Sequence, residues 1–347
     1  MARAIGYVVL FTLLVAAGCG QAEGQLGHSE KAMGGIGGGG SSYPVSKLDL
    51  PRFRSIRDVA EGYLKSAGRL DVSPSGFLAV TDPMAHRVFV LWPDGRVRLS
   101  IPVHEPLACA FLTDEYLLVG DGAWGDVRVY RLLGEKAFFK TRLQGGIGQF
   151  ARPGDIAVDR VSRRIYVVDS EADSVSVFAP AGNFLFSFGQ GGSGPGMLDF
   201  PTGIALDGST REVYVSDHDN ARVVVFDRDG NYLRSFGSYG SDVGQLNRPQ
   251  GIAIDGRGRV FVVDAFQGRL QVFDRKGAFV GYVGTFGRAR GQLYTPSDVA
   301  MDKAAGRMLV TSNGTGKLVA FEAGIPHLVR PYGGLLVMPM RKDGERR

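Results

Sequence analysis

The chain has 347 residues, of which 44% are hydrophobic and 22% charged, a composition that can bury a sizeable core and excludes wholesale disorder. Its net charge of +5 is modest, and part of it lies in the basic C-terminal tail, residues 336–347. A nucleic-acid binder needs a clustered basic face, so no nucleic-acid partner is predicted. The 51 glycines, with many β-branched and aromatic residues, indicate short strands joined by tight turns.

The N-terminus predicts export. A basic "MAR" precedes the apolar stretch "AIGYVVLFTLLVAAG", which has the length of a secretory signal and is short for a membrane span. The sequence "VAAGC" resembles the bacterial lipoprotein signal, although Ala16 replaces the usual leucine. The resemblance implies a signal peptide over 1–18, lipidation of Cys19 and a lipid anchor in the bacterial cell envelope, with Gly20 favouring the outer membrane. The alternative is an ordinary cleaved signal in which Cys19 is incidental.

A tether is predicted to follow the signal. Residues 19–45 are polar and rich in Gly and Ser, so they cannot bury a core. A flexible segment of about 25 residues spans roughly 25–30 Å, enough to hold a domain away from the membrane surface. Cys109 is the one cysteine that remains in the mature domain, so no internal disulfide is predicted.

Internal repetition is the strongest signal in the chain. Four copies align almost without gaps, and the prolines that begin them recur after 48, 48 and 47 residues, at Pro153, Pro201, Pro249 and Pro296. Each copy has four short apolar runs separated by turn sequences, the pattern of a four-stranded antiparallel propeller blade. With two weaker copies upstream, the prediction is an all-β, six-bladed β-propeller over 46–335. The blades are expected near 68–101, 106–143, 152–188, 200–236, 248–286 and 295–323.

A blade that is apolar on both faces needs a neighbour on each side, so the ring must close. The sequence "LPRFRSI" reads like the fourth strand of a copy, as in "NYLRSFG", but no three strands precede it. We predict that strand 51–56 completes the sixth blade. The segment 326–334 is a rival, and the sequence leaves the two open.

The fourth copy, "PTGIALD…VYVSDHDNARVVVFD…GNYLRSFG", closely resembles the NHL repeat. The resemblance covers 68–323 and is most specific in copies three to five. Copy two lacks the Pro-x-Gly-Ile-Ala start, and copy six has Ser312 in place of an aspartate. Some NHL-type propellers are lyases with a zinc held by histidines at the channel mouth. No histidine lies at the start of a copy here, so no metal or other cofactor is predicted.

An aspartate ends the second apolar run of five copies, and the residue five positions later begins the third run. A catalytic residue is needed once, whereas a structural one recurs with each repeat. We expect this carboxylate to pair with an arginine across the hairpin loop or to accept backbone N–H groups of the turn. The predicted structural pairs are Asp82 with Arg87, Asp217 with Arg222, and Asp264 with Arg269.

Candidate functional residues fall into two groups, and neither contains a predicted catalytic or metal-binding residue. The loop face comprises the turns between second and third strands and the linkers between blades, with Met84, Trp124, His218, Asp219, Tyr239 and Phe266 as candidate partner-binding residues. On the same face, Phe150 and Tyr294 either contribute to binding or fill gaps between blades. The candidate channel mouth comprises Asp155, Gln250 and Asp298.

Exposed aromatic and methionine side chains on loops are typical of protein interfaces. The chain is therefore predicted to be a monomeric, non-enzymatic scaffold or assembly factor that binds another protein of the cell envelope. The alternative is an extracytoplasmic lyase, hydrolase or small-ligand binder that uses the channel mouth.

Overall fold

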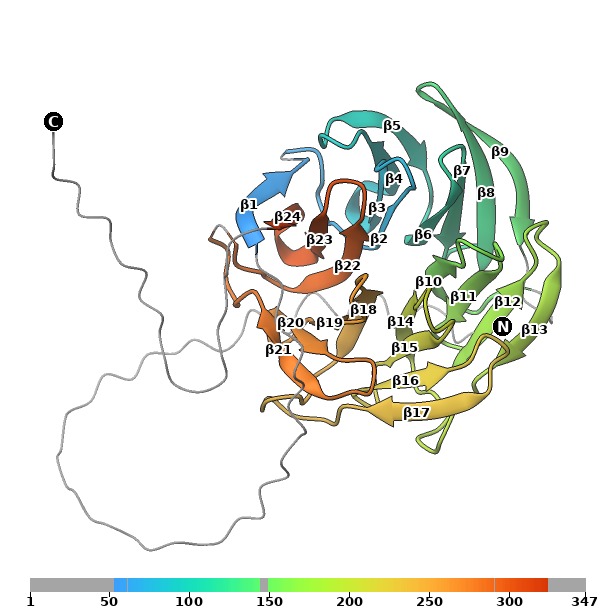
Figure 1. The fold of residues 1–347 in the computed structure, drawn as a ribbon. Coiled ribbons are helices and arrows are strands. Elements are labelled where there is room, and N and C mark those ends of the chain that lie inside the picture. Colours follow the sequence, from blue (N-terminus) through green and yellow to red (C-terminus); the bar gives the residue numbers. More distant parts are fainter. Residues whose placement is uncertain (1–52, 61, 144–148, 290, 324–347) are drawn as a thin grey trace, which may run out of the picture. The chain divides into compact units, whose positions relative to one another are not determined.

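The computed structural model describes residues 53–60, 62–143, 149–289 and 291–323, whose strands form six four-stranded antiparallel sheets (Figure 1). The predicted all-β, six-bladed propeller is confirmed. Cys19, the tether, the segment 326–334 and the tail lie outside the described residues. The described residues include no helix long and apolar enough to cross a bilayer.

The blades follow the repeat. The first contains β2 (Leu70–Val72), β3 (Leu78–Asp82), β4 (Arg87–Leu91) and β5 (Val97–Pro102). The second contains β6 (Pro106–Thr113), β7 (Tyr116–Asp121), β8 (Asp126–Leu133) and β9 (Lys136–Leu143). The third contains β10 (Pro153–Val158), β11 (Ile165–Asp169), β12 (Ser174–Phe178) and β13 (Phe184–Phe188).

The fourth contains β14 (Pro201–Leu206), β15 (Val213–Asp217), β16 (Arg222–Phe226) and β17 (Tyr232–Phe236). The fifth contains β18 (Pro249–Ile254), β19 (Val260–Asp264), β20 (Arg269–Phe273) and β21 (Phe279–Val283). The sixth contains β22 (Pro296–Asp302), β23 (Arg307–Ser312), β24 (Lys317–Ala323) and β1 (Phe53–Val59). Two single 3-10 turns, η1 (Pro83–Ala85) and η2 (Asn313–Thr315), link second to third strands.

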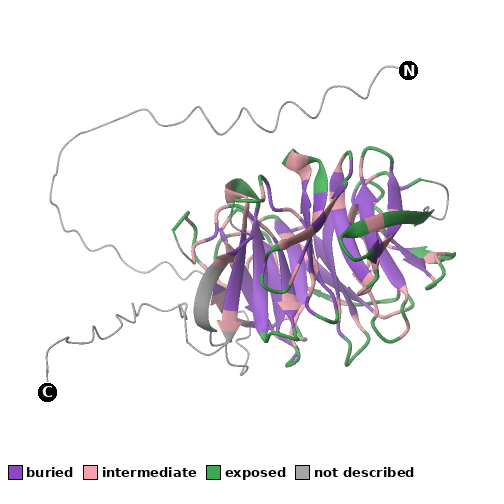
Figure 2. Ribbon diagram, turned by 90° about the horizontal axis from the view of Figure 1, so that it is seen from above, coloured by how far each residue is buried: buried purple, intermediate pink, exposed green. Residues whose placement is uncertain are grey.

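The first strands of the blades contact one another in the order β2, β6, β10, β14, β18, β22 and again β2, which makes a closed ring around a channel. Core clusters join adjacent blades, as where Tyr214 of the fourth packs with Phe273 of the fifth. Second strands such as β15 are buried along their whole length because a neighbouring blade covers each face. Figure 2 shows buried residues along the strands and exposed residues mainly in the turns.

The ring is closed by a strand from the N-terminal side. Strand β1 pairs antiparallel with β24, with Val59 opposite Leu318. Both of these side chains are buried in the cluster between the sixth and first blades. Lys317 Nζ also lies 2.8 Å from Asp58 Oδ2 across this pair. The sixth blade therefore joins residues from the two ends of the repeat region, and β1 overlaps the segment 51–56.

The recurring aspartate fastens the linker that leads into its own blade. Asp169 accepts hydrogen bonds from the backbone N–H of Ala151 (2.9 Å) and Arg152 (2.7 Å), which directly precede β10. Asp217 accepts one from Asp199 at 2.7 Å. In the sixth blade Ser312 takes this place, and its hydroxyl accepts from Tyr294 at 3.2 Å. The end of each second strand thus holds the start of the first.

The arginine partner is less regular than the sequence indicated. Arg222 Nε donates to Asp217 at 2.7 Å and also binds carbonyl oxygens of the preceding linker. Arg87 instead donates to Ser100, and Arg269 to the Ser241 carbonyl. Within the described ranges, no direct ion pair joins Arg87 to Asp82 or Arg269 to Asp264. Backbone N–H donors occupy those two carboxylates, so the arginine is free to bind elsewhere.

We expect Asp217→Ala to lower the free energy of unfolding by about 1–3 kcal/mol, because the part-buried linker N–H of Asp199 and the Arg222 guanidinium lose their buried acceptor. Chemical denaturation measures this loss. Asp219→Ala, in the same loop but exposed, serves as the control and should leave stability unchanged. Equal stability of both variants would contradict the structural role.

A chain shortened to begin at residue 62 lacks β1 and leaves the edge of β24 unpaired. We expect its unfolding midpoint to fall by more than about 5 °C, because the apolar cluster around Val59 becomes exposed. A chain that begins at residue 46 keeps β1 and should unfold at the full chain's midpoint. Similar midpoints for both shortened chains would show that β1 does not stabilise the ring.

Candidate functional site

Equivalent residues of the six blades form a layer across the channel. In blades two to six, this residue is the second one after the proline that begins the blade. Strand pairing places Asp155, Gly203 and Asp298 opposite the residue before the recurring Asp or Ser of β11, β15 and β23. The registers of the other three blades put one cation and two small residues at this level beside Gly203 and the two carboxylates. The six positions are Arg69, Ala108, Asp155, Gly203, Gly251 and Asp298.

Arg69 of the first blade spans this layer, with only 8% of its surface exposed. Its Nε donates to the carbonyl oxygen of Gly154 at 3.1 Å, and its guanidinium also donates to the Thr202 carbonyl. Nη1 lies 3.7 Å from Asp298 Oδ1. The side chain therefore reaches from the first blade to the third, fourth and sixth. A larger residue at Gly251 would collide with the Asp298 carboxylate, which explains the glycine there.

Asp155 and Asp298 are buried in this layer, so they do not form the open channel mouth expected from the sequence. Asp155 accepts the backbone N–H groups of Ile156 and Ile204, each at 2.9 Å. Asp298 accepts those of Val299 at 2.9 Å and Leu70 at 2.8 Å. Each carboxylate thus links its own first strand to that of the next blade, because the unpaired N–H groups of inner edge strands need acceptors.

Burial raises the pKa of both carboxyl groups, and the Arg69 guanidinium opposes the effect. Repulsion from Asp155 adds to the rise at Asp298, whose pKa is about 7, and repulsion from Asp71 adds to the rise at Asp155. Gln250, the third expected mouth residue, precedes the layer by one position and is half-buried. We call Arg69, Asp155 and Asp298 the brace, because together they span the channel. Both carboxylates and two nitrogens of Arg69 bond to backbone groups, whereas the buried Nη1 of Arg69 has no hydrogen-bond partner among the described residues.

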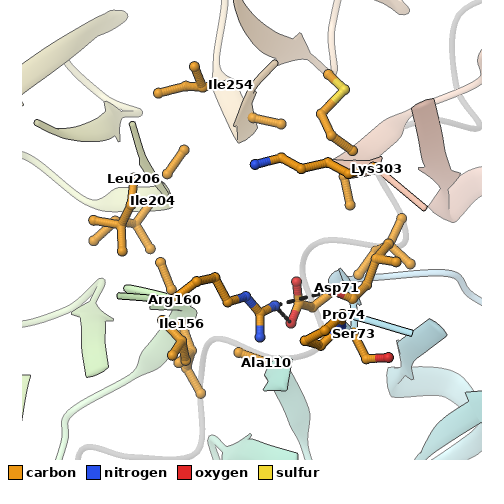
Figure 3. A pocket seen from close by; sticks show the side chains of 18 of the residues that line it. Asp71, Ser73, Pro74, Ala110, Ile156, Arg160, Ile204, Leu206, Ile254 and Lys303 are labelled. Carbon is orange, nitrogen blue, oxygen red and sulfur yellow. Dashed lines mark hydrogen bonds and ion pairs between the residues drawn. The ribbon is translucent and has the colours of Figure 1, made fainter. Parts of the chain in front are cut away.

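A cavity of about 610 Å³ lies on the other side of the brace, lined by the ends of the first strands and the turns that follow them. Apolar side chains such as Ile204, Leu206 and Ile254 form much of its wall (Figure 3). The strand directions place its opening at the end opposite the loop face, because each first strand begins at the loop face and ends at the cavity.

Asp71 and Arg160 form the polar side of this cavity (Figure 3). Arg160 Nη2 lies 3.3 Å from Asp71 Oδ2, and the guanidinium also donates to the carbonyl oxygens of Phe111 (2.6 Å) and Val72 (3.1 Å). Burial raises the pKa of Asp71, against the opposing effect of Arg160. Sequence reasoning missed Arg69, Asp71 and Arg160. For Arg69 and Asp71 the signal lay in the weak first copy, where both replace the small residues found in most other copies; Arg160 belongs to the third copy.

The candidate residues of the loop face lie in turns and linkers, and most of them are exposed. Met84, Tyr239 and Phe266 are 67%, 74% and 69% exposed, and Trp124 is half exposed. His218 Nδ1 lies 2.6 Å from Asp219 Oδ1, and its ring contacts Phe200 edge-on. No group of three or more metal-ligating side chains occurs in the described part of the chain.

The two residues left open by the sequence differ from each other. Phe150 is buried between the second and third blades, where its ring contacts Phe178, so it fills a gap. Tyr294 is half-buried, and its ring lies 5.3 Å from that of the exposed Phe286. Phe286 therefore extends the apolar part of the loop face.

The brace predicts a pH dependence of stability. The pKa of Asp298 is raised from 3.8 to about 7, so between these values the folded chain holds a proton that the unfolded chain has released. Its stabilising contribution is complete below the lower value and is lost as the pH rises through the higher one. We expect Asp298→Asn to remove much of this fall, which has a maximum slope of roughly 1.4 kcal/mol per pH unit.

Unfolding by urea between about pH 4 and pH 8 measures the effect, with exposed Asp242→Asn as the control. The stability of the Asp298→Asn protein relative to the parent should rise across this range. Parallel pH profiles for the two proteins would contradict the assignment of the proton to the brace.

Comparison with known proteins agrees with this architecture. Residues 154–237 match a family model described as a 6-bladed beta-propeller. Among solved structures, a gluconolactonase from Xanthomonas campestris superimposes with a TM-score of 0.61 at 19% identity, covering 82% of this chain and 98% of that one. No curated protein matches the chain significantly. At this level of identity the likeness concerns the fold alone, and the chain is a six-bladed β-propeller.

Proposed function

We propose that this chain is a lipid-anchored propeller of the NHL type in the bacterial cell envelope, and that it binds another envelope protein through its loop face as a scaffold or assembly factor. The signal sequence and Cys19 support the location, and the repeat supports the NHL assignment. The exposed side chains of the loop face support the mode of action. The membrane is contacted through the lipid, and the propeller itself is a monomer.

The observation that carries the proposal is the exposure of large apolar side chains in the turns and linkers of one face. Met84, Trp124, Tyr239, Phe266 and Phe286 are all at least half exposed, and they come from turns or linkers at the same end of the blades. Large exposed apolar groups that gather on a soluble domain mark interaction sites, and aromatic and methionine residues are enriched at interfaces. Their loops are held by the aspartate fastenings beneath them, so the surface is largely preformed.

The brace supports a binding role over chemistry at the loop-face end of the channel. Arg69, Asp155 and Asp298 are buried and each bonds to backbone groups, so they offer little accessible surface to a substrate that enters from this side. His218 is paired with Asp219 in a single loop and has no further metal-ligating group with it in the described residues. A scaffold needs no catalytic groups on the face that binds its partner.

Site-specific photocrosslinking tests the proposal. A photoreactive amino acid at Phe266 or Tyr239 of the full-length protein, in membranes of its own bacterium, should yield one discrete crosslinked partner. The same amino acid at Val161, which is 79% exposed in a turn at the opposite end of the blades, should not yield it. Substitution of Trp124 and Phe266 by serine should reduce recovery of that partner about tenfold or more without lowering the unfolding midpoint. Equal crosslinking at Val161, or none at the loop face, would refute the proposal.

A further inference from the structure

We propose that the cavity beyond the brace binds a small organic carboxylate with an apolar body, and that Lys303 receives the carboxylate group. This site lies at the opposite end of the propeller from the loop face. It is a separate function, carried by residues that the protein-binding proposal does not use.

The first argument comes from a position of the repeat that faces the cavity. Five blades carry alanine there, whereas the first blade carries Asp71. The alanines are Ala110, Ala157, Ala205, Ala253 and Ala300. Small residues keep the cavity open in most blades, and the one departure introduces a charge. Asp71 also accepts the backbone N–H of Phe111 at 2.6 Å, so it links the first strands of two blades and places a carboxylate at the cavity wall.

The second argument concerns two basic residues at equivalent positions of the third and sixth blades. Arg160 follows Asp159 and Lys303 follows Asp302, directly after the first strand of each blade, where the fourth and fifth blades have Gly208 and Gly256. In a ring of six, the third and sixth blades lie opposite each other. Figure 3 shows Arg160 meeting Asp71 on one side of the cavity while Lys303 extends into it from another.

The lining of the cavity contains both carboxylates and cations, and the cations differ in whether they have a partner. Arg160 pairs with Asp71, whereas Asp114 at the rim keeps its charge and accepts two hydrogen bonds from Ser75. Among the residues that the structure describes, the ammonium group of Lys303 has no hydrogen-bond or ion-pair partner, and neither has the guanidinium of Arg163, which also lines the cavity. An ammonium group that points into a cavity is suited to a single carboxylate.

The walls and the floor define the rest of the ligand. Leu206, Ile254 and Met301 line the cavity beside Lys303, so the body of the ligand contacts aliphatic side chains. The volume of about 610 Å³ lies within the range of small-molecule sites. The brace of Arg69, Asp155 and Asp298 closes the inner end, so the ligand enters and leaves from the turn side. A short aliphatic or aromatic carboxylate meets these requirements.

Calorimetric titration of the full chain with octanoate tests the site, with 1-octanol as a probe of equal length and no charge. We expect saturable octanoate binding with a Kd below about 1 mM. Lys303→Met keeps the aliphatic stem and should weaken octanoate about tenfold or more while leaving octanol unchanged. Lys303→Arg should restore most of the octanoate affinity because the positive charge returns.

Lys303 and Lys276 are both exposed, but only Lys303 lines the cavity, so Lys276→Met is the matched control and should bind octanoate as the parent does. Leu206→Trp should weaken both probes, because the indole occupies the cavity. Absence of saturable octanoate binding by the parent, or equal octanoate affinity in the Lys303→Met and parent proteins, would overturn the proposal. Serine substitutions at Trp124 and Phe266 should leave octanoate affinity unchanged, which separates this site from the loop face.

Discussion

Each blade of this propeller is apolar on both faces of its sheet, and covering both faces is the constraint on which the rest of the structure depends. The fully buried second strands show it most directly, because every side chain of β15 or β19 faces a neighbouring blade or the interior. No blade can satisfy this constraint alone, so the chain must form a ring. The ring in turn requires a strand from before the first repeat, and β1 supplies it beside β24.

The polar residues follow from the same constraint. The first strand of each sheet has no strand paired with it on its channel side, so backbone N–H groups there and in the linkers need other acceptors, and unpaired buried donors are costly. The recurring aspartate supplies acceptors at the linkers, while Asp155 and Asp298 supply them between first strands. Carboxylates that looked like candidate chemistry therefore complete the hydrogen bonding of the fold. The residues left for function are those that depart from the repeat, such as Lys303 and the exposed aromatic residues of the loop face.

Much of the fold could be predicted because the repeat recurs in the sequence at a nearly constant spacing. The proline spacing and the turn sequences predicted the number of blades, and the recurrence of Asp217 around the ring predicted its structural use. The candidate site was harder to predict from the sequence than the fold. Asp155 and Asp298 were expected to be open, because the sequence does not show how closely first strands approach across the channel. The reach of Arg69 to the fourth blade depends on the radius of the ring, which no local pattern encodes. Asp71 occupies a position that is alanine in the other five blades. This difference can be recognised only once the registers of the strands are known.

The strand that closes the ring has a consequence for how the chain folds. Asp58 and Lys317 lie 259 residues apart in sequence and meet across the β1–β24 pair. Of the described strands, β1 is made first and its partner β24 last, so the edge of β1 stays unpaired until β24 has been synthesised. Contacts of such long sequence separation form slowly and leave adhesive strand edges exposed in the meantime. Ring closure is therefore the step at which a nascent chain is most vulnerable to aggregation.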